Sequence, residues 1–403
     1  MKRILILGGG AAGMVSAIAA KEASPETDVV LVEGNPRIGK KLLATGNGRC
    51  NLGNVHIGPE CYFTNNPGQL TRMLENMENP VQWFQAHGLL TRSDEAGRIY
   101  PCSGQAADVL NLLLFHLERL GVKMKTDSPV KAVIKKGTSF TVTLESGTKL
   151  FGNALILALG GSAGPQFGTS GFGLELAEAL GLQTEESYPC LVPLKCKKHQ
   201  ISGLGGIRVR AQATLWDGDK MIAAENGEIQ FTNYGLSGIA IMQLSGHLPR
   251  LYRPEIRLNL FPDYTPEELH ALLEGHLAVL DGAAPEVYMT GLMHRRVGMA
   301  VWASAGLPES GPVSSNHLSA FAQALQSWRF SGLSPTDYQS AQTAGGGLGL
   351  SQLSPETFEV RRIPGLFIVG ETLDAAGLCG GYNLHWAFGS GITAGRAAAT
   401  IQF

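Results

Sequence analysis

The chain has 403 residues, of which 44% are hydrophobic, and its formal net charge is −2. This length allows two or three domains, and this composition fills more than one core, so a disordered or fibrous protein is excluded. Lys and Arg form no basic stripe and no apolar stretch is long enough to span a bilayer, so neither nucleic acid nor a membrane is an expected partner.

The first predicted elements build a dinucleotide site. A short apolar strand over residues 2–7 leads into glycines with the G-x-G-x-x-G spacing, and the small residues 11–20 predict a helix. A second strand over residues 29–32 ends in an acid at the expected distance of about 20 residues, where a carboxylate accepts ribose hydroxyls. The glycines permit the tight turn, the approach to a pyrophosphate at the positive helix end, and close helix–strand packing. The contacts predicted in this half are Gly8, Gly10, Ala12, Gly13 and Glu33.

The following segments alternate between glycine-rich and periodic stretches. Apolar spacing predicts helical segments over residues 69–90 and 104–120. Short strands are predicted over 122–126, 130–135, 139–145 and 149–152, before a parallel strand over 154–159. That last strand ends in Gly160 and Gly161, which we expect to contact the adenosine half of the ligand.

The middle of the chain predicts an inserted region. Strand-like segments occur at residues 207–215 and 228–232, and helical stretches follow at 266–280 and 316–328. We interpret this region as a mixed β plus helical insertion that carries substrate specificity. The predicted boundaries are 1–188 for the first part of the ligand-binding domain, 189–342 for the insertion and 343–403 for the second part.

The end of the chain returns to the first domain and selects the ligand. An apolar strand over residues 365–371 ends in Gly370 and Glu371, and Gly380-Gly-Tyr-Asn383 precedes a helix over 384–400. We expect Asn383 to cap that helix. Its positive N-terminal end suits N1 and C2=O of a flavin, and Glu371 suits a ribityl hydroxyl. This combination favours FAD over NAD, because a nicotinamide enzyme has no use for a terminal strand–carboxylate–helix element.

At these motifs the chain resembles a known family. The segments Gly8–Gly13, Gly39–Asn51, Gly235–Ser245, Thr343–Gly347 and Gly370–Asn383 are similar to bacterial FAD-dependent oxidoreductases that include aminoacetone oxidase and bile-acid 3-dehydro-Δ4,6-reductase. These are distant relatives of the fumarate reductase and aspartate oxidase flavoproteins. The resemblance implies an α/β fold with a Rossmann-like FAD-binding domain built from both chain ends, non-covalent FAD, and an inserted β-barrel-like plus helical substrate region.

The motifs and the resemblance together extend the set of expected FAD contacts. Many relatives have Gly-Gly-Gly-Arg-Cys-Asn where this chain has Gly46-Asn-Gly-Arg49, a departure that places a side chain near the expected flavin edge. The further predicted contacts are Lys41, Thr45, Gly46, Asn47, Arg49, Cys50, Asn51, Val130, Gly160, Gly161, Gly370, Glu371, Gly381, Tyr382, Asn383 and Leu384. We expect Cys50 to be a packed side chain, since no partner cysteine accompanies it.

Cysteine and histidine spacing exclude other site chemistries. The six cysteines include no C-x-x-C pair, and the ten histidines show neither H-x-H nor H-E-x-x-H. These patterns predict reduced thiols in a cytoplasmic protein and no metal site.

The implied chemistry is hydride transfer at flavin N5, with the protein placing a small-molecule substrate and a proton donor. The candidate catalytic residues are Tyr382, His385 and Arg295. Three hypotheses stay open at this point: reduction of a conjugated C=C bond driven by transiently bound NAD(P)H, amine oxidation that releases hydrogen peroxide, and modification or binding of RNA by a flavoprotein. The sequence leaves the oligomeric state open.

Overall fold

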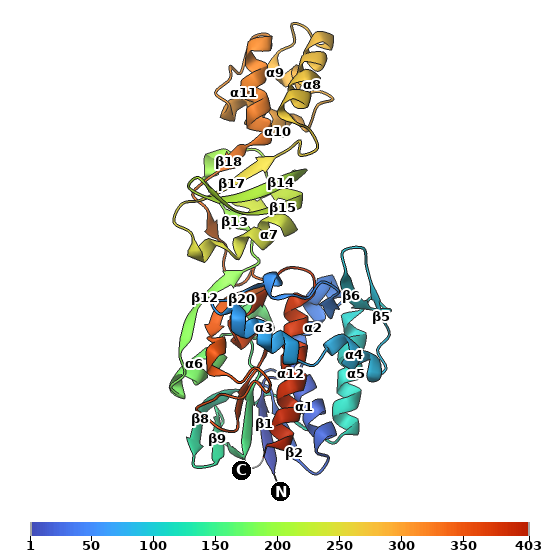
Figure 1. Cartoon of the computed structure of the whole chain (residues 1–403), viewed down its shortest axis with the longest axis vertical. Helices are drawn as coiled ribbons and strands as arrows, with labels where there is room; N and C mark the ends of the chain where they lie inside the picture. The colour runs from blue at the N-terminus through green and yellow to red at the C-terminus, as the bar shows by residue number, and fades with distance from the viewer. Residues whose placement is uncertain (1, 402–403) are drawn as a thin grey trace. The chain divides into compact units, whose positions relative to one another are not determined.

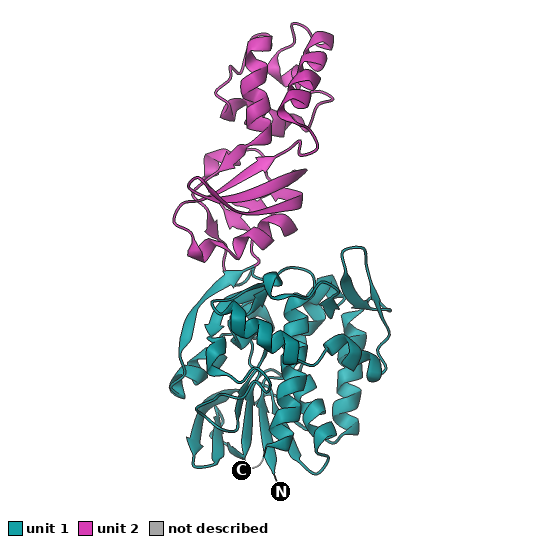
Figure 2. Ribbon diagram, viewed as in Figure 1, with its two compact units in different colours: residues 1–190, 338–403 teal, residues 191–337 magenta. Residues whose placement is uncertain are grey.

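The computed structural model describes residues 2–401. They form two compact units (Figure 2). Unit 1 contains the described residues up to Cys190 together with those from Tyr338 onward, and unit 2 contains Leu191–Asp337. Both ends of the chain therefore build unit 1, and unit 2 is an insertion between them.

A five-stranded parallel sheet forms the centre of unit 1. Its strand order is β21-β11-β1-β2-β7. The strands are β1 (Arg3–Leu7), β2 (Asp28–Val32), β7 (Lys123–Lys125), β11 (Ala154–Leu157) and β21 (Leu366–Ile368). Ile4–Leu7 of β1 are fully buried, as expected for a parallel strand covered on both faces. β21, which comes from the C-terminal part of the chain, pairs with β11, with Leu155 beside Leu366.

Two helices from opposite ends of the chain pack side by side on this sheet (Figure 1). They are α1 (Ala11–Ala23) and α12 (Tyr382–Thr400). A β-carbon at Gly391 would lie 2.5 Å from the Ala12 carbonyl oxygen, and one at Gly395 would lie 2.3 Å from that of Ser16. The Ser16 hydroxyl also donates to the Gly391 carbonyl at 2.9 Å. Small side chains thus allow the two backbones to approach closely.

The segment expected to be helical over residues 69–90 contains two helices, α3 (Pro67–Asn76) and α4 (Pro80–Ala86). Each begins at a proline, which cannot donate a hydrogen bond within a helix and suits its first position. Asn66 and Asn79 cap the two helices through their side chains. The interpretation of residues 69–90 as one helical segment was therefore wrong, because Asn79 and Pro80 start a second helix inside it.

The remaining elements of unit 1 surround the central sheet. The helices are α2 (Lys40–Ala44), α5 (Ala106–Arg119) and α6 (Phe172–Ala179). The antiparallel strands are β3 (Gly53–Asn54), β4 (Tyr62–Phe63), β5 (Thr91–Ser93), β6 (Arg98–Pro101), β8 (Val130–Lys136), β9 (Ser139–Leu144), β10 (Lys149–Gly152), β12 (Thr184–Cys190), β20 (Thr343–Leu348) and β22 (Ala376–Gly377).

Unit 2 has its own hydrophobic core. Its seven-stranded antiparallel sheet has the order β18-β17-β14-β15-β16-β13-β19. The strands are β13 (Leu194–Lys195), β14 (Arg208–Asp217), β15 (Lys220–Phe231), β16 (Gly235–Ser237), β17 (Pro254–Asn259), β18 (Trp328–Phe330) and β19 (Ser334–Pro335). The helices are α7 (Ile239–Ser245), α8 (Pro266–Val279), α9 (Pro285–Tyr288), α10 (Arg295–Ser304) and α11 (Ser315–Gln326). The periodic stretches at 266–280 and 316–328 correspond to α8 and α11, whereas the sequence reading missed α7, α9 and α10.

Among the helices of residues 2–401, none combines the length and the apolar character needed to cross a bilayer.

Candidate cofactor site

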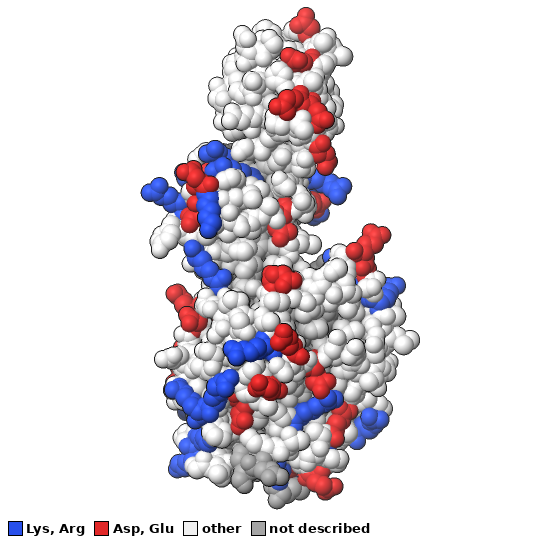
Figure 3. Space-filling view, in the orientation of Figure 1, with Lys and Arg blue, Asp and Glu red and all other residues white. Residues whose placement is uncertain are grey.

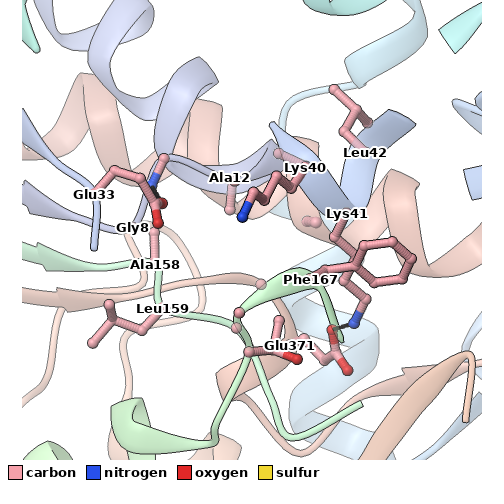
Figure 4. Close-up of a pocket in the computed structure, with 18 of the residues that line it drawn as sticks. Gly8, Ala12, Glu33, Lys40, Lys41, Leu42, Ala158, Leu159, Phe167 and Glu371 are labelled. Carbon is pink, nitrogen blue, oxygen red and sulfur yellow. Dashed lines mark hydrogen bonds and ion pairs between the residues drawn. The ribbon is translucent and has the colours of Figure 1, made fainter. Parts of the chain in front are cut away.

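A cavity of about 520 Å³ opens in unit 1 at the carboxyl ends of the central parallel strands (Figure 4). The loops that follow β1, β2, β11 and β21 all contribute to its lining. Ligands of open α/β sheets bind outside the carboxyl ends of the strands, so this is the expected position for a dinucleotide. The volume also lies within the range of small-molecule and cofactor sites.

The three glycines of the first motif have distinct physical roles. Gly8 adopts a left-handed φ of +106°, and a β-carbon there would lie 2.3 Å from the Ala158 carbonyl oxygen. A β-carbon at Gly13 would lie 1.9 Å from the Gly8 carbonyl oxygen, so this glycine permits close packing and does not line the cavity. Gly10 caps α1 and lines the cavity, and no atom lies within 4 Å of its β-carbon position. The open space at Gly10 is where a ligand approaches the helix N-terminus.

Glu33 follows β2 and holds the glycine turn after β1 in shape. One carboxylate oxygen accepts the Gly9 N–H at 2.8 Å. The other accepts the backbone and side-chain N–H groups of Asn35 at 2.8 and 2.7 Å. The acid predicted to bind a ribose thus lines the cavity and also joins the glycine turn to the loop after β2.

An ion pair joins two other walls of the cavity. Lys41 on α2 places its Nζ 2.6 Å from Oε2 of Glu371, which follows β21. The second Glu371 oxygen accepts the Ala344 N–H at 2.9 Å. Figure 4 shows both side chains directed toward each other at the cavity. Both were predicted contacts, but their pairing was not predicted, because they are distant in the sequence.

The last helix begins differently from the expectation. It starts at Tyr382 with Gly381 as its N-cap residue, and Gly381 has a left-handed φ of +108°. Asn383 is therefore not the cap. Its side chain instead accepts the Gly377 N–H and donates to the Gly377 carbonyl, both at 2.8 Å. The asparagine fixes the preceding glycine loop, and a left-handed glycine begins the helix.

The glycine-rich segment after α2 forms a strained turn. Asn47 and Cys50 have left-handed φ values of 55° and 57°, which are uncommon for residues with a side chain. The Cys50 N–H donates to the Thr45 carbonyl at 3.0 Å and closes the turn. Cys50 is fully buried, and burial raises the pKa of its thiol to about 12. Only Thr45 of this turn lines the cavity, while Arg49 is exposed.

Two of the candidate catalytic residues lie in the first turn of α12. Burial raises the pKa of Tyr382 to about 12, and its hydroxyl contacts Cys61. Burial lowers the pKa of His385 to about 4, and its Nδ1 is buried with no hydrogen-bond partner among the described residues. The third candidate, Arg295, begins α10 in unit 2, where it is exposed and forms an ion pair with Glu286 at 3.1 Å.

The cavity brings together part of the predicted set. The predicted residues that line it are Gly8, Gly10, Ala12, Glu33, Lys41, Thr45, Val130, Gly160, Gly370, Glu371, Asn383 and Leu384. The predicted residues outside its lining are Gly13, Gly46, Asn47, Arg49, Cys50, Asn51, Gly161, Gly381, Tyr382, His385 and Arg295.

Sequence reasoning missed several lining residues. They include Asn35, Lys40, Glu145, Phe167 and Gln342. Asn35 and Lys40 follow the acid after β2, so their place in that loop was an available signal. The other three come from segments that only the fold brings to the cavity.

Comparisons with known proteins identify the family of the chain. The profile of the family described as HI0933-like protein Rossmann domain matches residues 2–397. The chain is 35% identical to 3-dehydro-bile acid delta(4,6)-reductase from Clostridium scindens, over 99% of each chain. It is 29% identical to a ribosomal RNA dihydrouridine synthase from Escherichia coli, over 96% of this chain and 95% of that protein.

Solved structures with low sequence identity share the fold. Quinol fumarate reductase from E. coli matches with a TM-score of 0.51 and 16% identity, covering 99% of this chain and 70% of that chain. A 3-ketosteroid delta1-dehydrogenase from Sterolibacterium denitrificans matches with a TM-score of 0.50 and 12% identity, covering 99% and 100%. The predicted family and the predicted α/β Rossmann-like class are confirmed. The chain belongs to the HI0933-like Rossmann-domain family.

Proposed function

We propose that this protein binds FAD non-covalently in the unit 1 cavity and reduces a C=C bond conjugated to a carbonyl in a steroid-like small molecule. The observation that carries this proposal is the cavity built from both chain ends, whose lining includes the glycine turn after β1 and Glu371 after β21. The 35% identical relative named as a bile-acid delta(4,6)-reductase supports the substrate class.

The lining residues fit the parts of FAD. The open N-terminus of α1 at Gly10 suits the diphosphate, because free N–H groups and the helix dipole favour negative charge. Glu33 would accept ribose hydroxyls and Glu371 ribityl hydroxyls. Lys41 pairs with Glu371 and would hold that carboxylate in place, and the N-terminus of α12 provides a second positive dipole end.

When bound, FAD supplies hydride transfer at N5, and transiently bound NAD(P)H is its proposed source of electrons. The protein must supply the proton. The Tyr382 hydroxyl is protonated at neutral pH, as a tyrosine ordinarily is, and it lies in the first turn of α12, so it is our proposed donor. Burial lowers the pKa of His385 to about 4, so its imidazole is neutral at neutral pH, and it is our second candidate for handling the proton. Arg295 has no step in this proposal, since its guanidinium already pairs with Glu286.

A uridine in RNA is a second candidate substrate. The relatives named ribosomal RNA dihydrouridine synthase support it, at 29% and 25% identity. Reduction of uridine to dihydrouridine also saturates a C=C bond conjugated to a carbonyl, so the same site chemistry serves both. Lys and Arg are interspersed with Asp and Glu on the face shown in Figure 3, which provides no continuous basic stripe for RNA. We therefore prefer the small molecule.

Anaerobic flavin spectroscopy tests the proposal. The purified holoprotein is mixed without oxygen with NADH or NADPH, and the flavin absorbance is followed. We expect bleaching, and then recovery of the absorbance when a steroid enone is added. Persistence of the oxidised spectrum with both nicotinamides would contradict the reductase assignment. Recovery only with a uridine-containing RNA would favour the second candidate, and peroxide released with simple amines under air would favour an amine oxidase.

A further inference from the structure

We propose that Arg49, Arg92 and Arg98 form an anion-binding face beside the cofactor cavity, and that this face orients the substrate through a negatively charged group. The inference rests on the proposed reductase function and adds a chemical requirement to its substrate. The chemistry recognised is that of a carboxylate or a phosphodiester, both of which match the arginine fork.

The small β3–β6–β5 sheet places these arginines on one side. Arg92 on β5 is the direct cross-strand partner of Tyr100 on β6, and Arg98 is the partner of Asn54 on β3. Cross-strand partners share a face, and so do residues two apart on one strand. Asn54, Arg98, Tyr100 and Arg92 therefore lie on the same face of this sheet.

Arg49 reaches the same face from the strained turn. Its guanidinium carbon lies 4.7 Å from the centre of the Tyr100 ring. The Tyr100 ring thus contacts the Arg49 guanidinium, and Arg92 is the cross-strand neighbour of Tyr100. The left-handed residues Asn47 and Cys50 hold the turn that presents Arg49, and backbone strain of this kind clusters at functional sites.

Both borders of the face belong to elements that contact the cavity. On one side, Arg49 shares its closed turn with Thr45, which lines the cavity. On the other side, the Asn54 side chain donates to the Gly380 carbonyl at 3.0 Å, directly before α12. The Arg98 side chain also approaches Gly380, whose β-carbon position lies 3.6 Å from its Cγ. A substrate seated beside the cavity would therefore meet this face.

The charges of the face are largely uncompensated. Arg98 pairs with Asp94 at 2.8 Å. Arg49 and Arg92 are exposed, and neither forms an ion pair with a carboxylate among residues 2–401. Arg49 donates from Nε to the Gly46 carbonyl at 3.2 Å, which orients the guanidinium. Because Asp94 pairs with Arg98, the exposed guanidiniums of Arg49 and Arg92 leave a net positive face suited to an anion.

Paired substrates and matched variants test the inference. The holoprotein is assayed with a steroid enone that bears a side-chain carboxylate and with the neutral methyl ester of the same enone. A second arm compares a short uridine-containing oligonucleotide with free uridine. Arg49→Gln and Arg92→Gln are the test variants. Arg49→Lys keeps the charge without the guanidinium fork, and Arg72→Gln, at an exposed position on α3, is the control. Steady-state kinetics and substrate-induced changes in the flavin absorbance are both recorded.

We expect each glutamine variant to raise KM and the dissociation constant for the anionic substrate by about tenfold or more, as loss of a charged hydrogen bond predicts. The neutral partner should change by less than about twofold, with Arg49→Lys intermediate and Arg72→Gln unchanged. In the unmodified protein, added salt should weaken binding of the anionic substrate and not of the neutral one. If the anionic substrate is preferred in the steroid pair, the recognised group is a carboxylate; if it is preferred in the uridine pair, the recognised group is a phosphodiester.

Equal effects on anionic and neutral substrates, or no salt dependence in the unmodified protein, would overturn the anion-binding face. The salt measurement decides this even where a variant fails to fold. Absence of reduction with all four substrates would instead overturn the proposed function, so the two failures are distinguishable.

Discussion

The Lys41 ammonium lies 2.6 Å from Oε2 of Glu371, although 330 residues separate the two positions. Lys41 follows the second strand of the chain, and Glu371 follows the last strand of the central sheet. Both side chains line the same cavity and are partly buried. The pair shows that neither end of the chain forms the site alone.

Glu371→Gln should weaken FAD binding about tenfold, because the change removes a charged hydrogen-bond acceptor and leaves Lys41 without its partner. The dissociation constant is measured by quenching of flavin fluorescence on titration of the apoprotein. Glu118→Gln, at an exposed position on α5, is the matched control. An unchanged dissociation constant in the Glu371 variant would exclude this carboxylate from the cofactor site.

Gly10→Ala and Gly13→Ala should fail in different ways. The methyl group at Gly10 meets no protein atom within 4 Å but occupies the cavity, so the variant should fold and lose FAD affinity. The methyl group at Gly13 would meet the Gly8 carbonyl at 1.9 Å, so this variant should lose about 1–3 kcal/mol of stability or more. Thermal unfolding and FAD titration of both apoproteins separate the effects. Equal thermal stability of the two variants would contradict the assignment.

Gly395→Ala should destabilise unit 1 by a comparable amount, about 1–3 kcal/mol, because its methyl group would lie 2.3 Å from the Ser16 carbonyl of α1. Gly275→Ala on α8 is the control, since no atom lies within 4 Å of its β-carbon position. Alanine there should stabilise its helix by about 0.5–1 kcal/mol. Denaturant unfolding gives both values. A tolerated alanine at Gly395 would show that α1 and α12 can separate without cost.

His87 should keep its positive charge to a higher pH than an ordinary histidine does. Burial opposes its charge, but its hydrogen bonds to Glu22 and to the Trp83 carbonyl outweigh burial and raise its pKa. The distances to both acceptors are 2.7 Å, and two acceptors require a proton on each ring nitrogen. The neighbouring His116 is the opposite case, because burial lowers its pKa.

A pH titration followed through the ring-nitrogen shifts of His87, by NMR on histidine-labelled protein, should give a pKa above the ordinary histidine value. A raised folded pKa means that this stabilisation is fully present below the unfolded value of about 6.5 and is lost as pH rises through the folded value. Glu22→Gln should lower the His87 pKa toward its ordinary value. A His87 pKa at or below the ordinary histidine value would contradict the assigned hydrogen bonds.

Local patterns predicted the parts of the fold that depend on near neighbours. The buried strand over residues 2–7, the glycine turn and the small-residue helix follow from side-chain size and spacing, and β1 and α1 match them. Prediction was weaker where two local signals compete. Apolar spacing alone suggested one helical segment over residues 69–90. The structure shows a break at Asn79, which caps the second helix before Pro80.

The start of the last helix shows a different limit. Asparagine is a common N-cap residue, so Asn383 was a reasonable cap from the sequence. In the structure, its amide makes two hydrogen bonds to Gly377, and Gly381 takes the left-handed conformation that begins the helix. A side chain with several possible partners is assigned only when the fold shows which partner is within reach.

By itself, the sequence determined that this chain is an α/β protein with a dinucleotide motif at one end and a matching strand, acid and helix at the other. These conclusions depend on glycine, acid and apolar spacing within short segments, where chain connectivity already limits the geometry. Only the tertiary structure decided that Lys41 and Glu371 pair, that Gly10 faces open space while Gly13 packs, and that Arg49 joins Arg92 and Arg98 on one face. Such contacts join residues far apart in the sequence, so they arise from the packing of whole strands and helices.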